Sequence, residues 1–306
     1  MDTAREQILL LISTPIYVIV IGLEMLLSSV HHRKWYTTKG TFANIYLSAL
    51  NFGLDLMMLA VCLGLLGFFG KFQFFMITNP WIYWITLLVA EDFMFYLLHY
   101  IDHYCRFFWA VHVTHHSSEE FNLTVGFRSS VFQPLYRMFY FIPLALCGFR
   151  GIDIMLMYSA TQIYGILIHT QGIGKLGVLE WFMATPSHHR VHHASNPKYL
   201  DKNLGMIFIV WDRLFGTFEA EDPNEPVRYG LTKNIEHPNP FTLVFHEWIE
   251  IVKDLRKPIP FRYKLLYLFG PPGWSHDGSR KTSKQLEREY YSSKFAHEHE
   301  QHLVKK

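Results

Sequence analysis

Histidines spaced like metal ligands are the residues of this chain whose types and positions could do chemistry. His99 and His103 stand four residues apart, and the pattern H-x-x-H-H occurs twice further along. On a helix, residues three or four apart lie on one face, so each group would present its imidazoles together. That many imidazoles packed without a metal would repel one another as they protonate, and we therefore predict that they bind metal. The eight histidines are His99, His103, His112, His115, His116, His189, His192 and His193.

The predicted ligand set is built from imidazoles, without thiolates. Such a set suits zinc, copper, nickel or iron. Eight or nine ring nitrogens exceed what a single ion takes, so we expect two metal ions. His169, which ends an apolar run, is the ninth expected ligand. His188 adjoins the third group but would point about 100° away from His189 on a helix, and we leave it out of the ligand set.

Carboxylates close to these groups in the sequence are candidates for orienting the ligands. A metal-bound imidazole usually donates its second N–H to a carboxylate or a carbonyl. Asp92 lies seven residues before His99 on the same helical face, and Asp102 and Glu119 also lie beside histidine groups. Asp92 stands within an apolar run, where an ionisable side chain is costly and therefore points to a function. No residue beyond the metal ligands is predicted to be catalytic.

Long apolar runs surround the histidines. Of all residues, 18% are charged and 17% are aromatic, a composition that favours a membrane protein. Residues 131–149 and 152–170 form a pair of runs that either crosses the bilayer or dips into it, because Arg137 interrupts the first. We predict an all-α, multi-pass membrane helical bundle of about four to five spans with a cytoplasmic, histidine-rich di-metal cap. Three further runs are each long enough to span a bilayer, namely residues 8–30, 44–70 and 80–100.

The same pattern divides the chain into three parts. Residues 1–84 hold the N-terminal transmembrane helices, residues 85–250 hold the histidine groups, and residues 251–306 form a C-terminal cytoplasmic segment with a charged tail. From Gln171 onwards no apolar run reaches spanning length, so we expect a soluble cap of short helices and turns. The histidines of the tail alternate with glutamates, which is typical of a disordered segment rather than of a metal site.

The basic residues predict the orientation in the membrane. The loop after the first apolar run holds Arg33, Lys34 and Lys39, whereas the loop after the second holds only Lys71. The positive-inside rule therefore places residues 31–43 in the cytoplasm. The following spans then bring every histidine group to that same cytoplasmic face, in either a bacterial inner membrane or the endoplasmic reticulum.

Other functional classes find less support in the sequence. The formal net charge is +2, so nothing indicates nucleic-acid binding. The H-E-x-x-H motif of zinc proteases and the phosphate-binding P-loop motif are both absent. A membrane metal transporter or sensor stays open as an alternative from another class. A transporter would place its ligands near the bilayer midplane on broken helices with repeated halves, and we find no internal repeat.

The three histidine groups resemble the H-x3-H, H-x2-H-H and H-x2-H-H boxes of the fatty acid hydroxylase/sterol desaturase superfamily. The similarity covers about residues 85–250, includes Asp201-Lys202-Asn203 and Trp211-Asp212, and is highly specific for the superfamily. Residues 85–250 are accordingly expected to form a fatty acid hydroxylase-like catalytic domain. Three segments are most similar to the alkylglycerol monooxygenase (glyceryl-ether monooxygenase) family, namely those from His115 to Asn122, from Pro186 to His193 and from Trp211 to Ala220.

The resemblance implies a membrane-bound non-haem di-iron oxygenase that uses O2 on a lipid alkyl chain entering from the bilayer. Hydroxylation, including ether-lipid cleavage, is the implied reaction, and sterol desaturase-type dehydrogenation is the alternative. The two iron ions would need an external electron donor, soluble or membrane-bound, with tetrahydrobiopterin as one candidate. Iron is expected rather than zinc because zinc cannot change its oxidation state. The resemblance also implies that Asn203 supports the ligands, as Asp92 and Glu119 are expected to do.

Two residues depart from the pattern of that superfamily. Its first histidine group usually reads H-R-x-x-H-E, whereas here Tyr100 replaces the arginine and Tyr104 replaces the glutamate. The glutamate has been associated with the pterin-dependent subgroup. The departure therefore argues against a pterin reductant and against ether-lipid cleavage.

Overall fold

The computed structural model describes the backbone of residues 2–304 and the side chains of residues 13–296. This part of the chain is helical and contains no strand, and its β-type pairs are the isolated bridges Met183–Phe208 and Ala194–Tyr229. The prediction of an all-α protein is confirmed. The elements in order are α1 (Asp2–Val30), α2 (Thr38–Gly70), α3 (Pro80–Tyr104), α4 (Arg106–His116), η1 (Leu123–Phe127), η2 (Gln133–Leu135), α5 (Arg137–Leu146), α6 (Gly151–Leu167), η3 (Gly177–Trp181), α7 (Pro186–His192), η4 (Pro197–Tyr199), α8 (Val210–Phe215), α9 (Pro240–Leu255), α10 (Phe261–Phe269) and α11 (Ser283–Val304).

Within the described chain, three helices are long and apolar enough to cross a membrane: α1 over Ser13–Val30, α2 and α3. Helix α5 has 10 residues and α6 has 17. At 1.5 Å per residue α6 extends over roughly 25 Å, less than the thickness of about 30 Å of a bilayer core. Neither helix of the α5–α6 pair is therefore long enough to cross a bilayer. The structure supports three spans, and the expected number of four to five is not confirmed.

Helix α3 carries the first histidine group because its two ends are fixed by local sequence. Asn79 caps the start, with its side chain accepting the amides of Trp81 (2.9 Å) and Ile82 (3.2 Å), and Pro80 occupies the first helical position. Both are features of a helix N-terminus. After 25 residues the chain becomes extended at Cys105, with φ −120° and ψ 119°, and α4 turns back beside α3. This reversal places the second histidine group next to the first.

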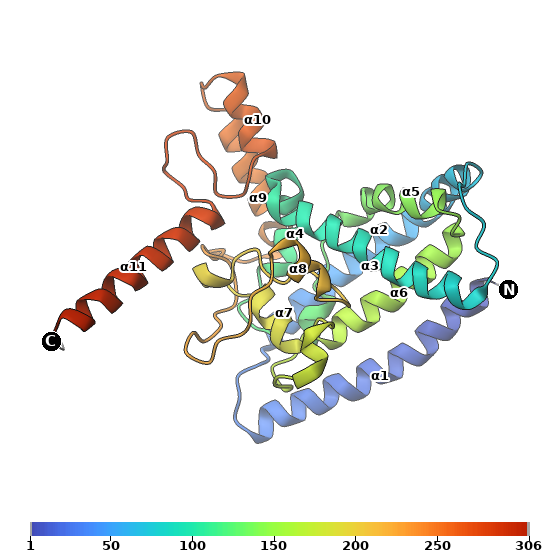
Figure 1. Ribbon diagram of the computed structural model, residues 1–306, viewed down its shortest axis with the longest axis horizontal. Coiled ribbons are helices and arrows are strands. Elements are labelled where there is room, and N and C mark those ends of the chain that lie inside the picture. Colours follow the sequence, from blue (N-terminus) through green and yellow to red (C-terminus); the bar gives the residue numbers. More distant parts are fainter. Residues whose placement is uncertain (1, 305–306) are drawn as a thin grey trace.

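The spanning helices run side by side between two distinct ends (Figure 1). At one end, the loop that follows α1 contacts the chain after α4, since the Asn122 side chain donates to the Trp35 carbonyl at 2.5 Å. At the other end, the loop after α2 contacts the end of α5 through a bond of 2.8 Å from the Phe74 amide to the Leu146 carbonyl. The histidine groups lie at the first end, together with the basic loop, as the sequence predicts.

Glu24 ties α1 to this end of the molecule. Its buried carboxylate accepts the Leu123 amide at 2.8 Å and the hydroxyls of Tyr36 and Thr170. A buried carboxylate is costly unless its oxygens are hydrogen-bonded. Glu24, the single charged residue of the first apolar run, thus hydrogen-bonds three segments that lie beside the histidines.

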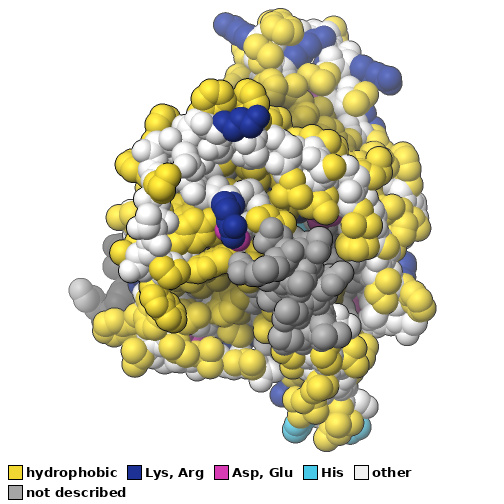
Figure 2. All heavy atoms as spheres, turned by 90° about the vertical axis from the view of Figure 1, so that its right-hand side faces the viewer, with side chains coloured by type: hydrophobic (Ala, Val, Ile, Leu, Met, Phe, Trp, Pro, Cys, Tyr) yellow, Lys and Arg dark blue, Asp and Glu magenta, His cyan; other side chains and the backbone are white. Residues whose placement is uncertain are grey.

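Apolar side chains form both the core and much of the exterior. The core joins α2, α3, α5 and α6 around Leu66, Leu87, Phe141 and Ile154, each at most 1% exposed. On the outside, hydrophobic side chains cover most of the end that carries the loop between α2 and α3 (Figure 2). Patches of this extent on a soluble monomer would be unusual, whereas a bilayer solvates them.

The part after Gln171 forms short helices and turns, as expected, but the tail differs from its prediction. Residues expected to be disordered form α11. This helix packs on the preceding cap, because Glu287 pairs with Lys202 at 3.0 Å and the Tyr290 hydroxyl donates to Glu225 at 3.1 Å. The side chains of the tail histidines His297, His299 and His302 lie outside the described residues.

Candidate metal centre

Nine buried or half-buried histidines converge in two groups at one end of the helical bundle. In each group the ligand nitrogens all lie within 4.8 Å of one another. The five-histidine group comprises His99, His103, His112, His116 and His192. The four-histidine group comprises His115, His169, His189 and His193. The structure therefore brings together all nine histidines that the sequence singles out as ligands.

Each H-x-x-H-H motif contributes to both groups. On α4, His112 and His116 point to the five-histidine group while His115 points to the other. At α7 the arrangement is reversed, since His189 and His193 belong to the four-histidine group and His192 to the five-histidine group. Residues four apart on a helix share a direction, and the residue between them is rotated to one side. The motif is therefore suited to a helix that lies between two sites.

Backbone carbonyls hold four of the nine rings by their Nδ1 atoms. A carbonyl oxygen can only accept, so an Nδ1 that contacts one carries the proton and leaves the Nε2 lone pair free. This is the tautomer that a metal ligand needs. The carbonyl contacts are His99 with Leu204 (2.7 Å), His115 with Arg128 (2.8 Å), His169 with Gly165 (2.7 Å) and His192 with Lys202 (3.0 Å).

Two rings use side-chain partners instead. His103 Nδ1 lies 3.1 Å from the carboxylate of Asp201, and His112 Nδ1 lies 3.0 Å from the Ser130 hydroxyl and 3.7 Å from Asp102. Asp102 is itself held by Tyr136 and Gln133 at 2.6 and 3.0 Å. Asp102, expected to accept the second N–H of a ligand, thus lies near His112, but the Ser130 hydroxyl is the hydrogen-bond partner of that ring. The carboxyl groups of Asp102 and Asp201 both lie near the five-histidine group.

The inward-facing nitrogens fit a cation better than they fit one another. His99 and His112 bring their Nε2 atoms to 3.0 Å, and His169 and His189 bring theirs to 2.9 Å. A tetrahedral or octahedral ion with bonds of about 2.1 Å separates neighbouring ligand nitrogens by roughly 3.0–3.4 Å. The Nε2 atoms of His103 and His192 are buried without any hydrogen-bond partner, which is costly unless something else binds them. The donor set thus fits one metal ion in each group.

Burial keeps these rings neutral. Desolvation lowers the pKa of His115 from 6.5 to about 4. It also holds the pKa values of His116, His189, His192 and His193 well below 6.5, with neighbouring imidazoles adding to the effect. A neutral imidazole is the form that binds metal. The protein is therefore ready for metal binding near neutral pH without first releasing protons.

The loop of residues 201–204 supplies three of the acceptors described above. Asp201 and Asn203 adopt positive φ angles of 57° and 55°, a conformation that aspartate and asparagine tolerate better than most residues. Asp212 fixes the end of the loop by accepting the amides of Leu204 and Gly205 at 2.7 and 2.8 Å. The bends turn the Asp201 side chain and two backbone carbonyls towards the imidazoles.

Two of the three expected supporting residues, Asn203 and Asp92, bond to neighbouring segments rather than to the imidazole rings. Asn203 bonds the His188 and Glu219 carbonyls at 3.1 and 2.7 Å and touches no imidazole directly. It supports the loop and so acts through its neighbours. Asp92 accepts the Ile207 and Phe208 amides and the Trp211 ring N–H, at 2.8, 3.2 and 2.8 Å. The prediction that Asp92 orients a histidine was therefore wrong, because the donors of residues 207–211 occupy its carboxylate.

Glu119 is a second correction. Its side chain is exposed and lies beside Gly230 rather than beside a histidine. The last turn of α4 ends at His116, so residue 119 no longer follows the helical face. His188, by contrast, lies outside both groups with its ring packed on Phe218, as expected from its angle to His189.

Sequence reasoning missed the acceptors that the backbone provides. The carbonyls of Arg128, Gly165 and Leu204 carry no side-chain signal, since any residue offers the same oxygen. Ser130 and Asp201 could in principle have been identified from the sequence, because their acceptor atoms belong to side chains. Asp201 belongs to a segment already noted for its resemblance, and a carboxylate near a histidine group is the usual partner of a ligand.

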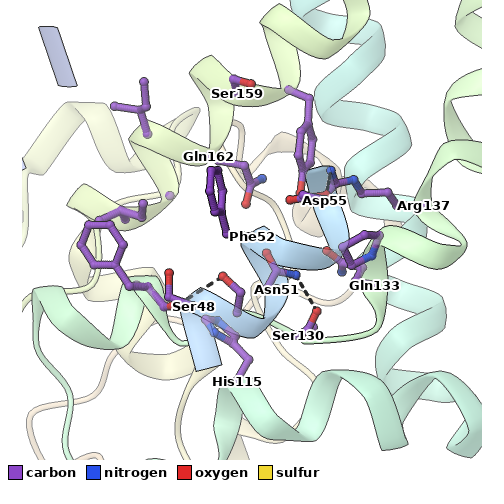
Figure 3. A pocket seen from close by; sticks show the side chains of 18 of the residues that line it. Ser48, Asn51, Phe52, Asp55, His115, Ser130, Gln133, Arg137, Ser159 and Gln162 are labelled. Atoms are coloured by element: carbon purple, nitrogen blue, oxygen red, sulfur yellow. Dashed lines mark hydrogen bonds and ion pairs between the residues drawn. The ribbon is translucent and has the colours of Figure 1, made fainter. Parts of the chain in front are cut away.

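A cavity of about 420 Å³ opens beside both groups. Five of the nine histidines line it: His99, His112, His115, His169 and His189. From there it follows α2 and α6, past Ser48, Asn51 and Gln162 (Figure 3). Its lining also reaches α1 at Ser13 and Tyr17. Its outer lining includes Phe52 and Leu56, which are 59% and 58% exposed on the apolar exterior. The cavity therefore connects the histidines with the lipid-facing side of the bundle.

Helices of membrane-spanning length and two clusters of imidazoles suited to metal define a membrane protein with a histidine-built centre. Residues 84–217 match the fatty acid hydroxylase family. The resemblance seen in the histidine boxes is thereby confirmed.

Three curated relatives illustrate what the chain is similar to. The chain is 39% identical over 196 residues to the alkylglycerol monooxygenase of Xenopus tropicalis, covering 64% of this chain and 43% of that protein. It is 32% identical over 273 residues to the alkylglycerol monooxygenase of Danio rerio, covering 86% and 59%. A Delta(7)-sterol 5(6)-desaturase of Aspergillus fumigatus is 24% identical over 167 residues, covering 47% and 51%. The chain thus spans about half the length of the curated relatives it matches. No solved structure matches it.

Proposed function

We propose that the chain is a membrane-bound non-haem di-iron oxygenase that hydroxylates a lipid alkyl chain with O2. The observation that carries this proposal is the cavity, which joins the apolar exterior to both groups of inward-facing imidazoles. The match of residues 84–217 to the fatty acid hydroxylase family and the similarity to monooxygenases support an oxidoreductase. We assign the activity to residues 85–250, which contain all nine histidines.

Each group of histidines would hold one iron ion. When bound, iron supplies the change of oxidation state that oxidation of an unactivated C–H bond requires. The chain contributes neutral, oriented imidazoles and surroundings that exclude water. Three of the four rings in the four-histidine group line the cavity, against two of five in the other. The four-histidine group is therefore the one more open to substrate.

The substrate would enter from the bilayer, because the cavity lining reaches the exposed apolar faces of α1 and α2. The relatives named alkylglycerol monooxygenase make a glycerol ether lipid the first candidate. Sterol desaturase-type dehydrogenation is the second candidate, favoured by the match to the Aspergillus fumigatus desaturase. A metal transporter is not favoured, since both histidine groups lie at one end of the bundle rather than along it.

Hydroxylation inserts one oxygen atom of O2 into a C–H bond and reduces the other to water, which takes two electrons and two protons from a donor. We propose an external donor, soluble or membrane-bound. Tyr100 and Tyr104 stack with ring centroids 4.2 Å apart and line a separate hollow of about 170 Å³ together with Asp201. No charged side chain stands at these two positions. Tetrahydrobiopterin is accordingly one candidate electron donor among several. Supplying each donor in a separate reaction distinguishes them.

We further propose that the histidine groups face the cytoplasm. Their end of the bundle also carries the loop with Arg33, Lys34 and Lys39, and the positive-inside rule places such a loop there. A cytoplasmic site would let electrons arrive from soluble reductants while the alkyl chain stays in lipid.

The proposal is tested with membranes that contain the expressed chain and a labelled alkylglycerol. Tetrahydrobiopterin, a ferredoxin system and a cytochrome system are supplied in separate reactions. We expect an O2-dependent oxidised product with at least one donor, and close to two iron ions per purified chain by elemental analysis. No oxidised product from ether lipid, acyl lipid or sterol with any donor would overturn the enzyme. Full activity with stoichiometric zinc would overturn the di-iron centre.

A further inference from the structure

Polar side chains cross the cavity at a depth where lipid would surround the bundle. We call them the polar band: Asn51, Asp55, Gln133, Arg137 and Gln162 (Figure 3). Asp55 lies near the middle of α2, the longest of the spanning helices. An ionisable side chain inside a membrane is expensive and by default points to a functional role. A cavity built only for hydrocarbon would have no use for these groups.

The charges in the polar band cancel each other. Arg137 donates from both terminal nitrogens to both carboxylate oxygens of Asp55, and its buried guanidinium also contacts the Tyr158 hydroxyl at 3.0 Å. The same guanidinium lies 4.4 Å from the centre of the Tyr158 ring. The pair therefore presents donors and acceptors without net charge. A ligand with a charge of its own would have to separate it.

Gln162, on α6, adds a donor that has no partner within the protein. Its Nε2 atom is buried and has no hydrogen-bond partner. Such a group costs free energy unless a ligand satisfies it. A carboxylate has about four acceptor positions, so Asp55 can accept a further bond beyond those from Arg137. A hydroxyl group, which both donates and accepts, can satisfy Asp55 and Gln162 together.

The polar band lies within reach of the histidines. Gln162 lies on α6 and precedes His169, two residues past the end of that helix, by seven residues. At the helical rise this interval corresponds to roughly 10 Å. Past the band the lining becomes apolar, with Met58, Cys62, Met138 and Met155. Polar and apolar parts of one ligand can thus be accommodated separately.

We infer that the polar band is a head-group subsite that selects lipids with an uncharged, hydroxyl-bearing head. The head is held inside the cavity, and a phosphate in its place is rejected by Asp55. This inference rests on the proposed function, because it assumes that a lipid occupies the cavity. It goes further by naming the residues that discriminate among lipids.

The test measures binding to the purified, iron-loaded full chain without O2, so that turnover plays no part. Three probes share one alkyl chain: hexadecylglycerol, its dimethyl ether with both hydroxyls capped, and hexadecyl phosphate. Wild-type protein is expected to bind hexadecylglycerol most tightly. Because a net hydrogen bond changes affinity by roughly two- to tenfold, Gln162→Leu should weaken hexadecylglycerol by that factor. The capped ether can still accept from Gln162 but can no longer donate to Asp55, so wild type should bind it less tightly than hexadecylglycerol by a similar factor.

Gln162→Leu removes an unpaired polar group, so we expect its melting temperature to stay the same or rise. Gln73→Leu is the matched control, since Gln73 is exposed in the loop at the other end of the bundle. Asp55→Asn leaves Arg137 without its anion and should shift preference towards hexadecyl phosphate. Equal binding of hexadecylglycerol by wild type, Gln162→Leu and Asp55→Asn would overturn the subsite while leaving the oxygenase intact. Failure of wild type to bind any of the three probes would overturn both proposals.

Discussion

At the scale of single residues, the groups around the imidazoles set the ring orientations that suit metal binding. Contacts among the imidazoles themselves do not set them. Carbonyls of three segments, at Arg128, at Gly165 and in the loop of residues 201–204, hold Nδ1 atoms. The Nε2 atoms then meet at 2.9–3.1 Å. In a protein without an ion these nitrogens would face each other with no proton between most of them. The free energy lost in that arrangement is recovered when a cation binds, which couples metal binding to the stability of the fold.

Alanine at His103 or His192 should remove a ligand whose Nε2 has no other partner. A lost ligand cannot be replaced at the same geometry, so we expect iron content and turnover to fall at least tenfold. The same holds for the other seven histidines. His188→Ala is the matched control, because His188 is buried beside the site yet outside both groups. Iron content that falls equally in the control and in the ligand variants would contradict the assignment.

Acid should destabilise the metal-free protein before it destabilises the loaded one. Burial lowers the pKa of His115 from 6.5 to about 4, so the unfolded chain binds a proton below pH 6.5 that the folded chain does not. Stability from this group is complete above pH 6.5 and is lost as the pH falls towards 4. Melting temperatures measured across this range, with and without iron, check the sign. A metal-free melting temperature that rises on acidification would contradict it.

At the scale of elements, α3, α4 and α7 hold their histidines where helical spacing predicts, because i, i+3 and i+4 positions depend on the local chain alone. The loop of residues 201–204 could not be predicted in the same way. Its shape depends on positive φ angles and on Asp212, and two of its acceptors are backbone oxygens. Helix α11 was also missed, since its contacts with Lys202 and Glu225 come from residues far away in the sequence.

Arg106 joins the histidine helix α4 to α9 and α10. Its buried guanidinium donates to Glu247 at 2.7 Å, to Asp254 at 2.6 Å and to the Tyr267 carbonyl at 3.2 Å. We expect Arg106→Met to destabilise the fold by about 3 kcal/mol, because Glu247 and Asp254 would lose the buried guanidinium that pairs with them. Thermal unfolding in detergent measures the change.

Lys253→Met is the control for this prediction. Lys253 pairs with Glu250 at 2.7 Å on the surface, with both side chains about half exposed or more. Exposed pairs of this kind contribute about 0–1 kcal/mol. Equal losses of stability in the two variants would show that Arg106 is no more than another surface charge.

At the scale of the whole molecule, the histidines and the basic loop after α1 share one end, and the loop after α2 lies at the other. A reporter inserted within residues 33–40 should therefore give the cytoplasmic signal, and one within residues 71–79 the opposite signal. A fusion after Lys306 should agree with the first reporter. A first reporter on the far side of the membrane would overturn the cytoplasmic assignment and leave the geometry of the site unaffected.

The shared use of α4 and α7 by both histidine groups has a consequence for how the centre fills. Each of these helices contributes two rings to one group and one ring to the other. The first ion to bind would therefore coordinate three of these six rings and fix both helices in place for the second ion, lowering the entropy that the second ion must remove. Loading should be cooperative, with a steep iron titration and little half-filled protein. Removal by a chelator should likewise empty both positions together.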